Sequence, residues 1–112
     1  MSTPGWSPDE KRIAQEVFEA AAGREIGEIV ADFQKRAANI QSSNEMWSLE
    51  KYLRDARRDF EVKYDYRSSV LIRVFGRLLA EHRIAEEALA RLSRAKLEET
   101  RAFATTWAAP VR

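Results

Sequence analysis

A single stripe of apolar side chains runs through the N-terminal part of this 112-residue chain, and no proline interrupts it after Pro8. Its members recur at steps of three or four residues: Phe18, Ala22, Ile26, Ile29, Phe33, Ala37 and Ile40. This spacing predicts a helix from Pro8 to about Ile40, which is roughly 50 Å long. A compact domain of this size has a radius of gyration of only about 13 Å. We therefore expect an elongated molecule whose stripe is covered by another surface, most simply the same helix of a second copy.

Two capping signals mark where helices begin. Ser7 precedes Pro8 and Glu10, which places a hydroxyl at the N-cap, proline at the first helical position and a glutamate three residues on. Ser42 and Glu45 repeat the pattern after the polar turn 41–44. We therefore expect a second helix to begin after Ser42.

Gly23 and Gly27 lie four residues apart in the first helix. They either permit the close approach of another helix or merely weaken this one. We expect the second, because this spacing is a weak signal outside membranes.

The apolar positions after Ser42 also follow a helical period. Those of the second helix alternate steps of three and four: Met46, Leu49, Leu53, Ala56 and Phe60. A wide apolar face follows at Val70, Leu71, Val74, Phe75, Leu78 and Leu79, and the period extends through Ile84, Ala88, Leu89, Leu92, Ala95 and Phe103. The periodicity alone allows one continuous helix from Leu79 into Ile84. The predicted fold class is all-α, with a tail over 105–112 that lacks a cap and is expected to fray.

Composition excludes several functional classes. The length indicates a single domain over 1–112, and 45% apolar residues in periodic order argue against disorder. No run of about 18 apolar residues exists, so we expect no membrane insertion. The N-terminal residues do not resemble a secretory signal, and the absence of cysteine suits a cytoplasmic location. A net charge of +1 gives no reason to expect nucleic acid as a partner.

Charge is nevertheless unevenly distributed along the chain. From Asp9 to Asp32 there are seven acidic and three basic residues, whereas Lys51 to Arg58 holds four basic residues and one acidic residue. Antiparallel packing of these segments, within one chain or between two, would be assisted electrostatically. The alternative is that both are solvated faces with unrelated charge, since exposed pairs contribute little.

The residues that usually perform chemistry are sparse. His82 is the only histidine, and we interpret it as a helix C-terminal capping residue. The adjacent glutamates at 86–87 and 98–99 point in different directions on a helix, so they cannot share a proton or an ion. We expect no enzyme activity, no metal site and no cofactor.

Trp47 lies beside the apolar seam of the second helix, at the head of a row of arginines. Tryptophan and arginine are enriched at the centres of protein interfaces, so this row is a candidate binding surface. Alternatively, Trp47 covers the edge of the core and the arginines pair with acids of the first helix. The spacing alone leaves both interpretations open.

The run from Lys63 to Ile72, KYDYRSSVLI, places charged residues and tyrosines in a joint between two helical segments. Trp47 precedes this run by sixteen residues, and Trp6-Ser7, Arg24-Glu25-Ile26 and Val74-Phe75 occur in the same order as in a known family. From about Trp6 to about Phe103 the chain resembles the fluorescence recovery protein family. The resemblance implies a dimer with a stalk of two long antiparallel helices, about 8–64, and a small helical head, about 67–104. It also implies a turn near His82-Arg83.

The resemblance further implies a function. Members of that family bind the C-terminal domain of the orange carotenoid protein and hasten its return from the red to the orange form, with no cofactor of their own. The family's functional patch holds a tryptophan, a His-Asp pair and an arginine. Trp47 and Arg57 match the first and last, with Arg58 adjacent, whereas Glu50-Lys51 replaces the His-Asp pair. The alternative is a dimerisation or scaffold module of the same family with a different client.

One set of residues is therefore expected to contact the partner protein, and another to contact a second copy of the chain. The expected partner-binding set is Trp47, Glu50, Lys51, Arg57, Arg58, Tyr64, Tyr66, Arg67 and Phe75. Either Tyr64 or Tyr66 could instead be buried, with its hydroxyl bonded to a carboxylate. The expected dimer interface is Ile26, Ile29, Phe33, Ala37, Leu49 and Leu53.

Overall fold

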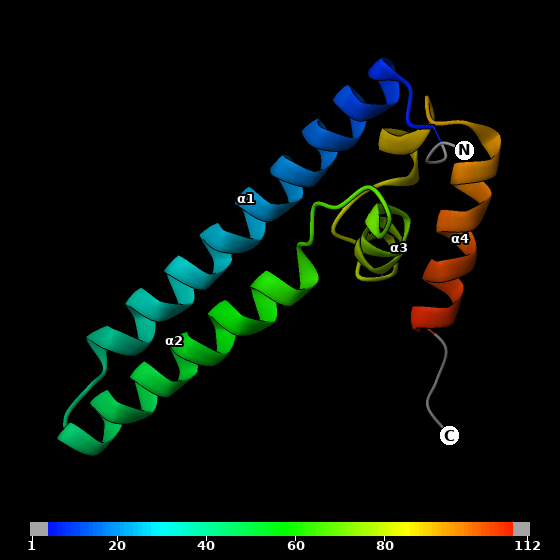
Figure 1. Ribbon diagram of the computed structural model, residues 1–112. Coiled ribbons are helices and arrows are strands. Elements are labelled where there is room, and N and C mark those ends of the chain that lie inside the picture. Colours follow the sequence, from blue (N-terminus) through cyan, green and yellow to red (C-terminus); the bar gives the residue numbers. More distant parts are fainter. Residues whose placement is uncertain (1–4, 109–112) are drawn as a thin grey trace. The chain divides into compact units, whose positions relative to one another are not determined.

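The computed structural model describes residues 5–108, and every regular element in that range is helical (Figure 1). The order along the chain is α1 (Pro8–Ala38), α2 (Ser43–Lys63), α3 (Leu71–Ala80), the 3₁₀ helix η1 (Glu86–Leu89) and α4 (Arg94–Ala108). The all-α prediction is confirmed. Among the described residues, no helix is both long enough and apolar enough to cross a membrane.

Both predicted helix starts are observed. The Ser7 N–H donates to Glu10 Oε1 at 3.1 Å and the Glu10 N–H donates to Ser7 Oγ at 3.1 Å, which is the reciprocal capping arrangement. At the start of α2, Ser42 Oγ accepts from the Glu45 N–H, while the Glu45 carboxylate accepts from the N–H of Gln41. These bonds satisfy amide groups that have no partner within the helices.

α1 ends at Ala38, two residues before the expected end at Ile40. The Asn39 side-chain amide donates to the Lys35 carbonyl at 2.9 Å, which satisfies one of the last carbonyls of the helix. Asparagine therefore terminates the helix before the apolar period itself runs out.

The end of α3 confirms the turn expected near His82-Arg83. His82 has a φ of 60°, in the left-handed region. The Arg83 N–H donates to the Leu78 carbonyl at 2.8 Å and the His82 N–H donates to the Leu79 carbonyl at 3.1 Å. These are the two bonds of a Schellman motif, a helix ending that usually places glycine where His82 stands. The continuous helix that the periodicity allowed is therefore excluded.

The helical period expected from Ile84 onward does not correspond to one α-helix. The chain forms η1 first, and α4 begins only after Ser93, whose hydroxyl accepts from the Lys96 N–H at 3.3 Å. Ile84, Leu89 and Leu92 are still buried, so these apolar side chains reach the core from turns and a 3₁₀ helix. α4 then continues to Ala108, beyond the expected end at 104, and residues 109–112 of the expected tail lie outside the described residues.

The described residues form two compact units. One is the segment Ala22–Tyr64, and the other combines the residues up to Ala21 with those from Asp65 onward. The second unit holds most of the core: Trp6, Ile13, Ala14, Ala21, Leu71, Val74, Phe75, Leu78, Ile84, Leu89 and Leu92. The first turns of α1 thus pack with the helices that follow residue 65.

The segment Ala22–Tyr64 is a helical hairpin made from the second half of α1 and all of α2 (Figure 1). Tyr52 of α2 donates to Asp32 of α1, and Tyr64, later in the chain, bonds Glu25, earlier in α1. The two helices therefore run in opposite directions. The buried side chains of α1 all precede Ala22, so its apolar stripe is only partly covered within the hairpin.

A Cβ placed on Gly23 or Gly27 would meet no atom within 4 Å. Within the described part of the chain, these glycines do not mediate a close helix approach. This agrees with the interpretation that they weaken the helix.

Candidate partner-binding surface

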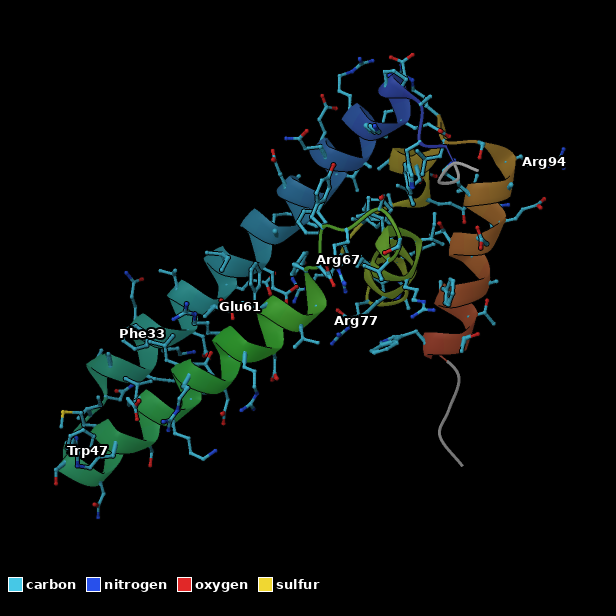
Figure 2. The ribbon with its side chains drawn as sticks, in the orientation of Figure 1. Phe33, Trp47, Glu61, Arg67, Arg77 and Arg94 are labelled. Atoms are coloured by element: carbon cyan, nitrogen blue, oxygen red, sulfur yellow. The ribbon has the colours of Figure 1, made fainter. Side chains whose placement is uncertain are left out.

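Trp47 is an exposed side chain near the N-terminal end of α2 (Figure 2). In the single chain, 61% of its surface is accessible, and Met46 beside it is also exposed. Burial against the core edge, the alternative interpretation, is not observed. A large aromatic group in this state can enter a partner's pocket without first being released from its own chain.

The charged side chains that follow Trp47 pair along α2 itself. Lys51 Nζ lies 2.8 Å from Asp55 Oδ2, and Arg58 reaches the same carboxylate at 3.3 Å. The hydrogen bond from Lys51 holds the pKa of the Asp55 carboxyl below its ordinary value. Glu50 pairs with Arg54 in the same manner. These i to i+4 and i to i+3 pairs are exposed and contribute little stability, so a partner can reorganise them at small cost.

Arg57 is likewise exposed, and its Nε lies 3.1 Å from Glu61 Oε2. The ion pairs formed by Lys51, Arg54, Arg57 and Arg58 thus involve acids of α2. This is the arrangement expected of a solvated face, and the electrostatic complementarity between the acidic and basic segments is not realised through these pairs.

Tyr64 is buried at the C-terminal end of α2. Its hydroxyl donates to Glu25 Oε1 at 2.7 Å. Of the two tyrosines considered in the sequence, Tyr64 is therefore the buried one whose hydroxyl bonds a carboxylate. Its ring also lies against Phe60, with the ring centroids 4.7 Å apart. In this structure Tyr64 makes internal contacts and offers little surface to a partner.

The other expected contact residues lie in the second unit. Tyr66 is exposed and meets the ring of Phe18 edge-on, with centroids 4.9 Å apart. Arg67 is exposed and binds Asp65 through two nitrogens, which holds the pKa of the Asp65 carboxyl below its ordinary value. Phe75 is fully buried in the core, so its expected role as a partner contact is corrected: apolar packing between helices, not binding, accounts for it.

An apolar groove lies on one side of the hairpin. It has a volume of about 450 Å³ and is lined by Ile26, Ile29, Val30, Leu53, Arg57, Phe60 and Glu61. Ile26 and Leu53 are 43% and 40% exposed, which is high for large apolar side chains that follow a helical period. We call this surface the hairpin groove. It contains three of the residues expected at a dimer interface: Ile26, Ile29 and Leu53.

The remaining expected interface residues are less accessible. Phe33 and Ala37 are half-buried, and Leu49 is buried within the hairpin. Leu49 therefore supports the contact between α1 and α2. Val30 and Phe60 of the groove were not among the expected interface residues. Val30 lies one position after Ile29 and outside the simple three-and-four spacing, whereas Phe60 follows the same apolar period of α2 as Leu49 and Leu53.

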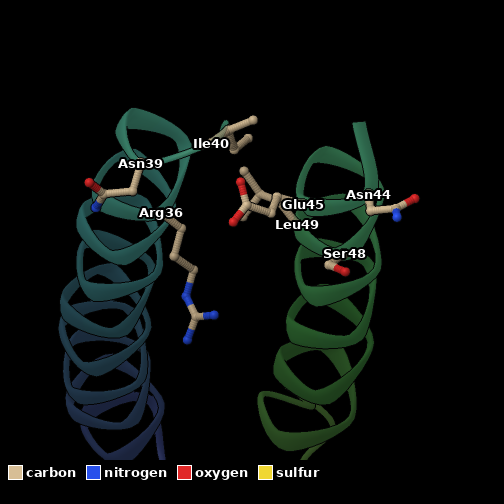
Figure 3. A pocket seen from close by; sticks show the side chains of 7 residues that line it. All are labelled: Arg36, Asn39, Ile40, Asn44, Glu45, Ser48 and Leu49. Atoms are coloured by element: carbon tan, nitrogen blue, oxygen red, sulfur yellow. The ribbon is translucent and has the colours of Figure 1, made fainter. Parts of the chain in front are cut away.

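A more polar pocket of about 400 Å³ lies at the end of the hairpin, between the last turn of α1 and the first turns of α2 (Figure 3). Its lining combines Arg36, Asn39, Ile40, Asn44, Glu45, Ser48 and Leu49. Arg36 is engaged by Asp32 at 2.9 Å, and its guanidinium lies over the ring of Tyr52. The hydrogen bond from Tyr52 to Asp32 raises the pKa of the Tyr52 hydroxyl. Within 5–108, no group of three or more His, Asp or Glu side chains is placed to hold a metal ion.

Comparison with known proteins gives consistent matches over nearly the whole chain. Residues 6–104 match the family described as photoprotection regulator fluorescence recovery protein. The fluorescence recovery protein of Synechocystis sp. PCC 6803 is 34% identical over 99 residues, which cover 88% of this chain and 91% of that protein. Its solved structure matches with a TM-score of 0.84 and 34% identity, over 89% of this chain and 98% of that one. The Fremyella diplosiphon fluorescence recovery protein gives the same TM-score and coverage at 31% identity.

Proposed function

The chain belongs to the fluorescence recovery protein family of photoprotection regulators, and we propose that it binds the C-terminal domain of an orange carotenoid protein and accelerates its red-to-orange reversion. The proposed activity is regulatory and requires no catalytic group or cofactor. A second candidate is a dimeric scaffold of the same family with a different client. The Glu50-Lys51 pair, at the position of the family's His-Asp pair, is the observation that favours this second candidate.

The mechanism we propose is differential binding. A partner that binds the compact form of the carotenoid protein, or the transition state leading to it, more tightly than the open form lowers the barrier to closure. The red form then relaxes faster. This protein needs only a surface whose contacts are stronger in one state than in the other.

The observation that carries the proposal is the exposure of Trp47 on the same helix as Arg57. Both match the family's functional patch by resemblance, and both are accessible. Glu50, Lys51 and Arg58 on this helix are exposed as well, although each is paired with a neighbour on α2. We propose Trp47 as the apolar anchor. Arg57 also lines the hairpin groove, but 79% of its side chain is exposed, and we propose it as a charged contact that exchanges Glu61 for an acid of the partner. Tyr66 and Arg67 are proposed as contacts of the other unit.

We further propose that two chains associate through the hairpin groove. The apolar surface that includes Ile26 and Val30 is left partly open by α2, and soluble proteins rarely leave such contiguous apolar surface uncovered. A second copy of the hairpin is the simplest cover, because it brings an identical apolar face and forms a closed interface. Residues 8–64 would then form the stalk of the dimer, and 67–104 its head.

The experiment that tests the proposed function is a relaxation assay. Red carotenoid protein is allowed to decay in the dark with and without this protein, and the ratio of the two rates is measured. We expect a ratio above one that rises with protein concentration. The double variant Glu50→His with Lys51→Asp should raise the ratio further, because it restores the family's residue pair.

A ratio of one for both the native protein and the double variant, at concentrations where self-association is intact, would contradict the proposal in favour of the scaffold with another client. Trp47→Ala serves as the inactive control. An acceleration that survives this substitution would remove Trp47 from the site without refuting the activity.

A further inference from the structure

Glu25 holds the last residues of α2 against α1. Its Oε1 accepts from the Tyr64 hydroxyl at 2.7 Å and lies 2.9 Å from Lys63 Nζ. The Lys63 side chain is only 5% exposed and that of Glu25 only 17% exposed. Hydrogen bonds to an ionised group in such surroundings are among the stronger ones in proteins.

This contact lies where α2 would otherwise loosen. Lys63 is the last helical residue, and Tyr64 is the C-cap, whose N–H donates to the Phe60 carbonyl at 2.9 Å. The last carbonyls of a helix lack partners within it, so terminal turns fray unless other contacts hold them. Glu25 supplies two such contacts from the neighbouring helix.

The ordered end of α2 is connected to the hairpin groove. The Tyr64 ring lies against Phe60 at 4.7 Å between centroids, with the planes inclined by 33°. Phe60 lines the groove together with Ile26 and Leu53. A continuous series of contacts therefore leads from the carboxylate of Glu25, through the ring of Tyr64, to the aromatic wall of the groove.

We infer that Glu25 and Tyr64 are positioning residues for the hairpin groove. The hydroxyl of Tyr64, fixed by Glu25, orients its ring, and that ring limits the positions of Phe60 and keeps the groove open to a second copy of the chain. The inference rests on the proposed function in one respect, that the groove is where two copies meet. It also assigns Tyr64 an internal task in place of direct partner contact.

The same hairpin contains a matched control. Tyr52 donates to Asp32 at 2.5 Å, so it is another tyrosine-to-carboxylate bond between α1 and α2. Its ring is covered by the Arg36 guanidinium at 4.1 Å, and Tyr52 does not line the groove. Removing either hydroxyl deletes one bond between the helices. Only the ring of Tyr64 lies against Phe60.

The experiment compares Tyr64→Phe with Tyr52→Phe by two measurements. Methyl NMR shifts of Ile26 and Leu53 report the position of the Phe60 ring, and sedimentation equilibrium reports self-association. For Tyr64→Phe we expect displaced methyl resonances and a dimer dissociation constant raised about tenfold, because the Tyr64 ring, released from Glu25, no longer holds Phe60 in the wall of the groove. For Tyr52→Phe we expect unmoved Leu53 and Ile26 methyl resonances and a dissociation constant within about twofold of the native value.

Equal effects of the two variants would overturn the inference, because they would show that hairpin stability in general governs the groove. Unmoved methyl resonances in Tyr64→Phe would also overturn it. If the native chain proves monomeric, the proposed self-association fails, but the methyl shifts still decide whether Tyr64 positions Phe60. The variant Tyr64→Leu, which removes the ring contact as well, should displace the resonances further than Tyr64→Phe.

Discussion

Gly76 of α3 lies directly against Phe103 of α4. A Cβ placed on Gly76 would come within 2.5 Å of the Phe103 Cβ and 3.1 Å of the Ala104 backbone nitrogen. No glycine among the described residues has a positive φ, so the requirement at position 76 is for space and not for an unusual backbone conformation. The absence of a side chain at Gly76 is what allows the two helices to approach so closely.

Gly76→Ala should therefore destabilise the protein. The added methyl group meets a Cβ and a backbone atom, which cannot rotate away, and such overpacking typically costs about 1–3 kcal/mol. Chemical denaturation monitored by circular dichroism measures the change. Gly27→Ala is the control and should raise the free energy of unfolding. It adds a methyl group in open space and improves helix propensity by about 0.5–1 kcal/mol. Equal stability of Gly76→Ala and the native chain would contradict the observed packing.

Glu10 joins the starts of two helices, since it accepts from the Ser7 N–H before α1 and from the Ser93 N–H before α4, the latter at 2.8 Å. Lys96 completes the site, with its Nζ 3.3 Å from Glu10 Oε1. Burial alone would raise the pKa of Glu10, but these hydrogen bonds outweigh it and hold the pKa below its ordinary value of 4.5. We expect Glu10→Gln to reduce the free energy of unfolding at pH 7 by roughly 1–2 kcal/mol.

The difference in the free energy of unfolding between the native protein and Glu10→Gln should depend on pH, and this dependence tests the role of the Glu10 charge. A carboxylate whose pKa is lower in the folded state adds stability that is present above about pH 4.5 and is lost as the pH falls through the folded pKa. The gap between native protein and Glu10→Gln should therefore narrow on acidification. Glu16→Gln, at an exposed position of α1, is the control and should change the free energy of unfolding at pH 7 by less than about 0.5 kcal/mol. A gap that stays constant from pH 7 to pH 3 would rule out the charge of Glu10 as its cause.

Ile26→Glu should weaken self-association while preserving the helices. Ile26 lines the hairpin groove and is 43% exposed in the single chain, so a carboxylate there can reach solvent in the monomer but is desolvated in the dimer. We expect the dissociation constant to rise by a factor of ten or more, roughly 1.4 kcal/mol per factor of ten. Analytical ultracentrifugation measures it. Val62→Glu, at an exposed apolar position outside the groove, is the control expected to remain dimeric.

Trp47→Ala should weaken binding to the carotenoid protein's C-terminal domain without altering stability. Truncation of a central aromatic anchor typically costs at least about 2 kcal/mol, or roughly thirtyfold in affinity. Because 61% of the Trp47 surface is already exposed in the single chain, the free energy of unfolding of the protein should change by less than about 0.5 kcal/mol. Calorimetry of binding and of melting separates the two effects. Trp107→Ala removes another exposed tryptophan, on α4, and should leave affinity unchanged. A thirtyfold loss in both variants would remove the special role of Trp47.

Local sequence signals predicted the features that depend on near neighbours in the chain. The capping pairs Ser7 with Glu10 and Ser42 with Glu45 predicted the starts of α1 and α2, because both partners lie within one helical turn. The apolar period predicted an all-α chain for the same reason. The resemblance to a family, carried by specific residues, added the turn at His82, which periodicity alone did not require.

The features that the sequence did not determine depend on residues far apart in the chain. Glu10 bonds to Ser93, Tyr64 to Glu25 and Gly76 packs on Phe103, and no local spacing indicates which distant group each will meet. Phe75 shows the consequence most clearly. As one apolar residue in a family-like motif it was expected to contact a partner, whereas the tertiary structure buries it completely. Spacing along the chain therefore indicated the helical character of the chain and the starts of its first two helices. The competition among apolar faces for the same core decided which side chains remain on the surface to bind another molecule.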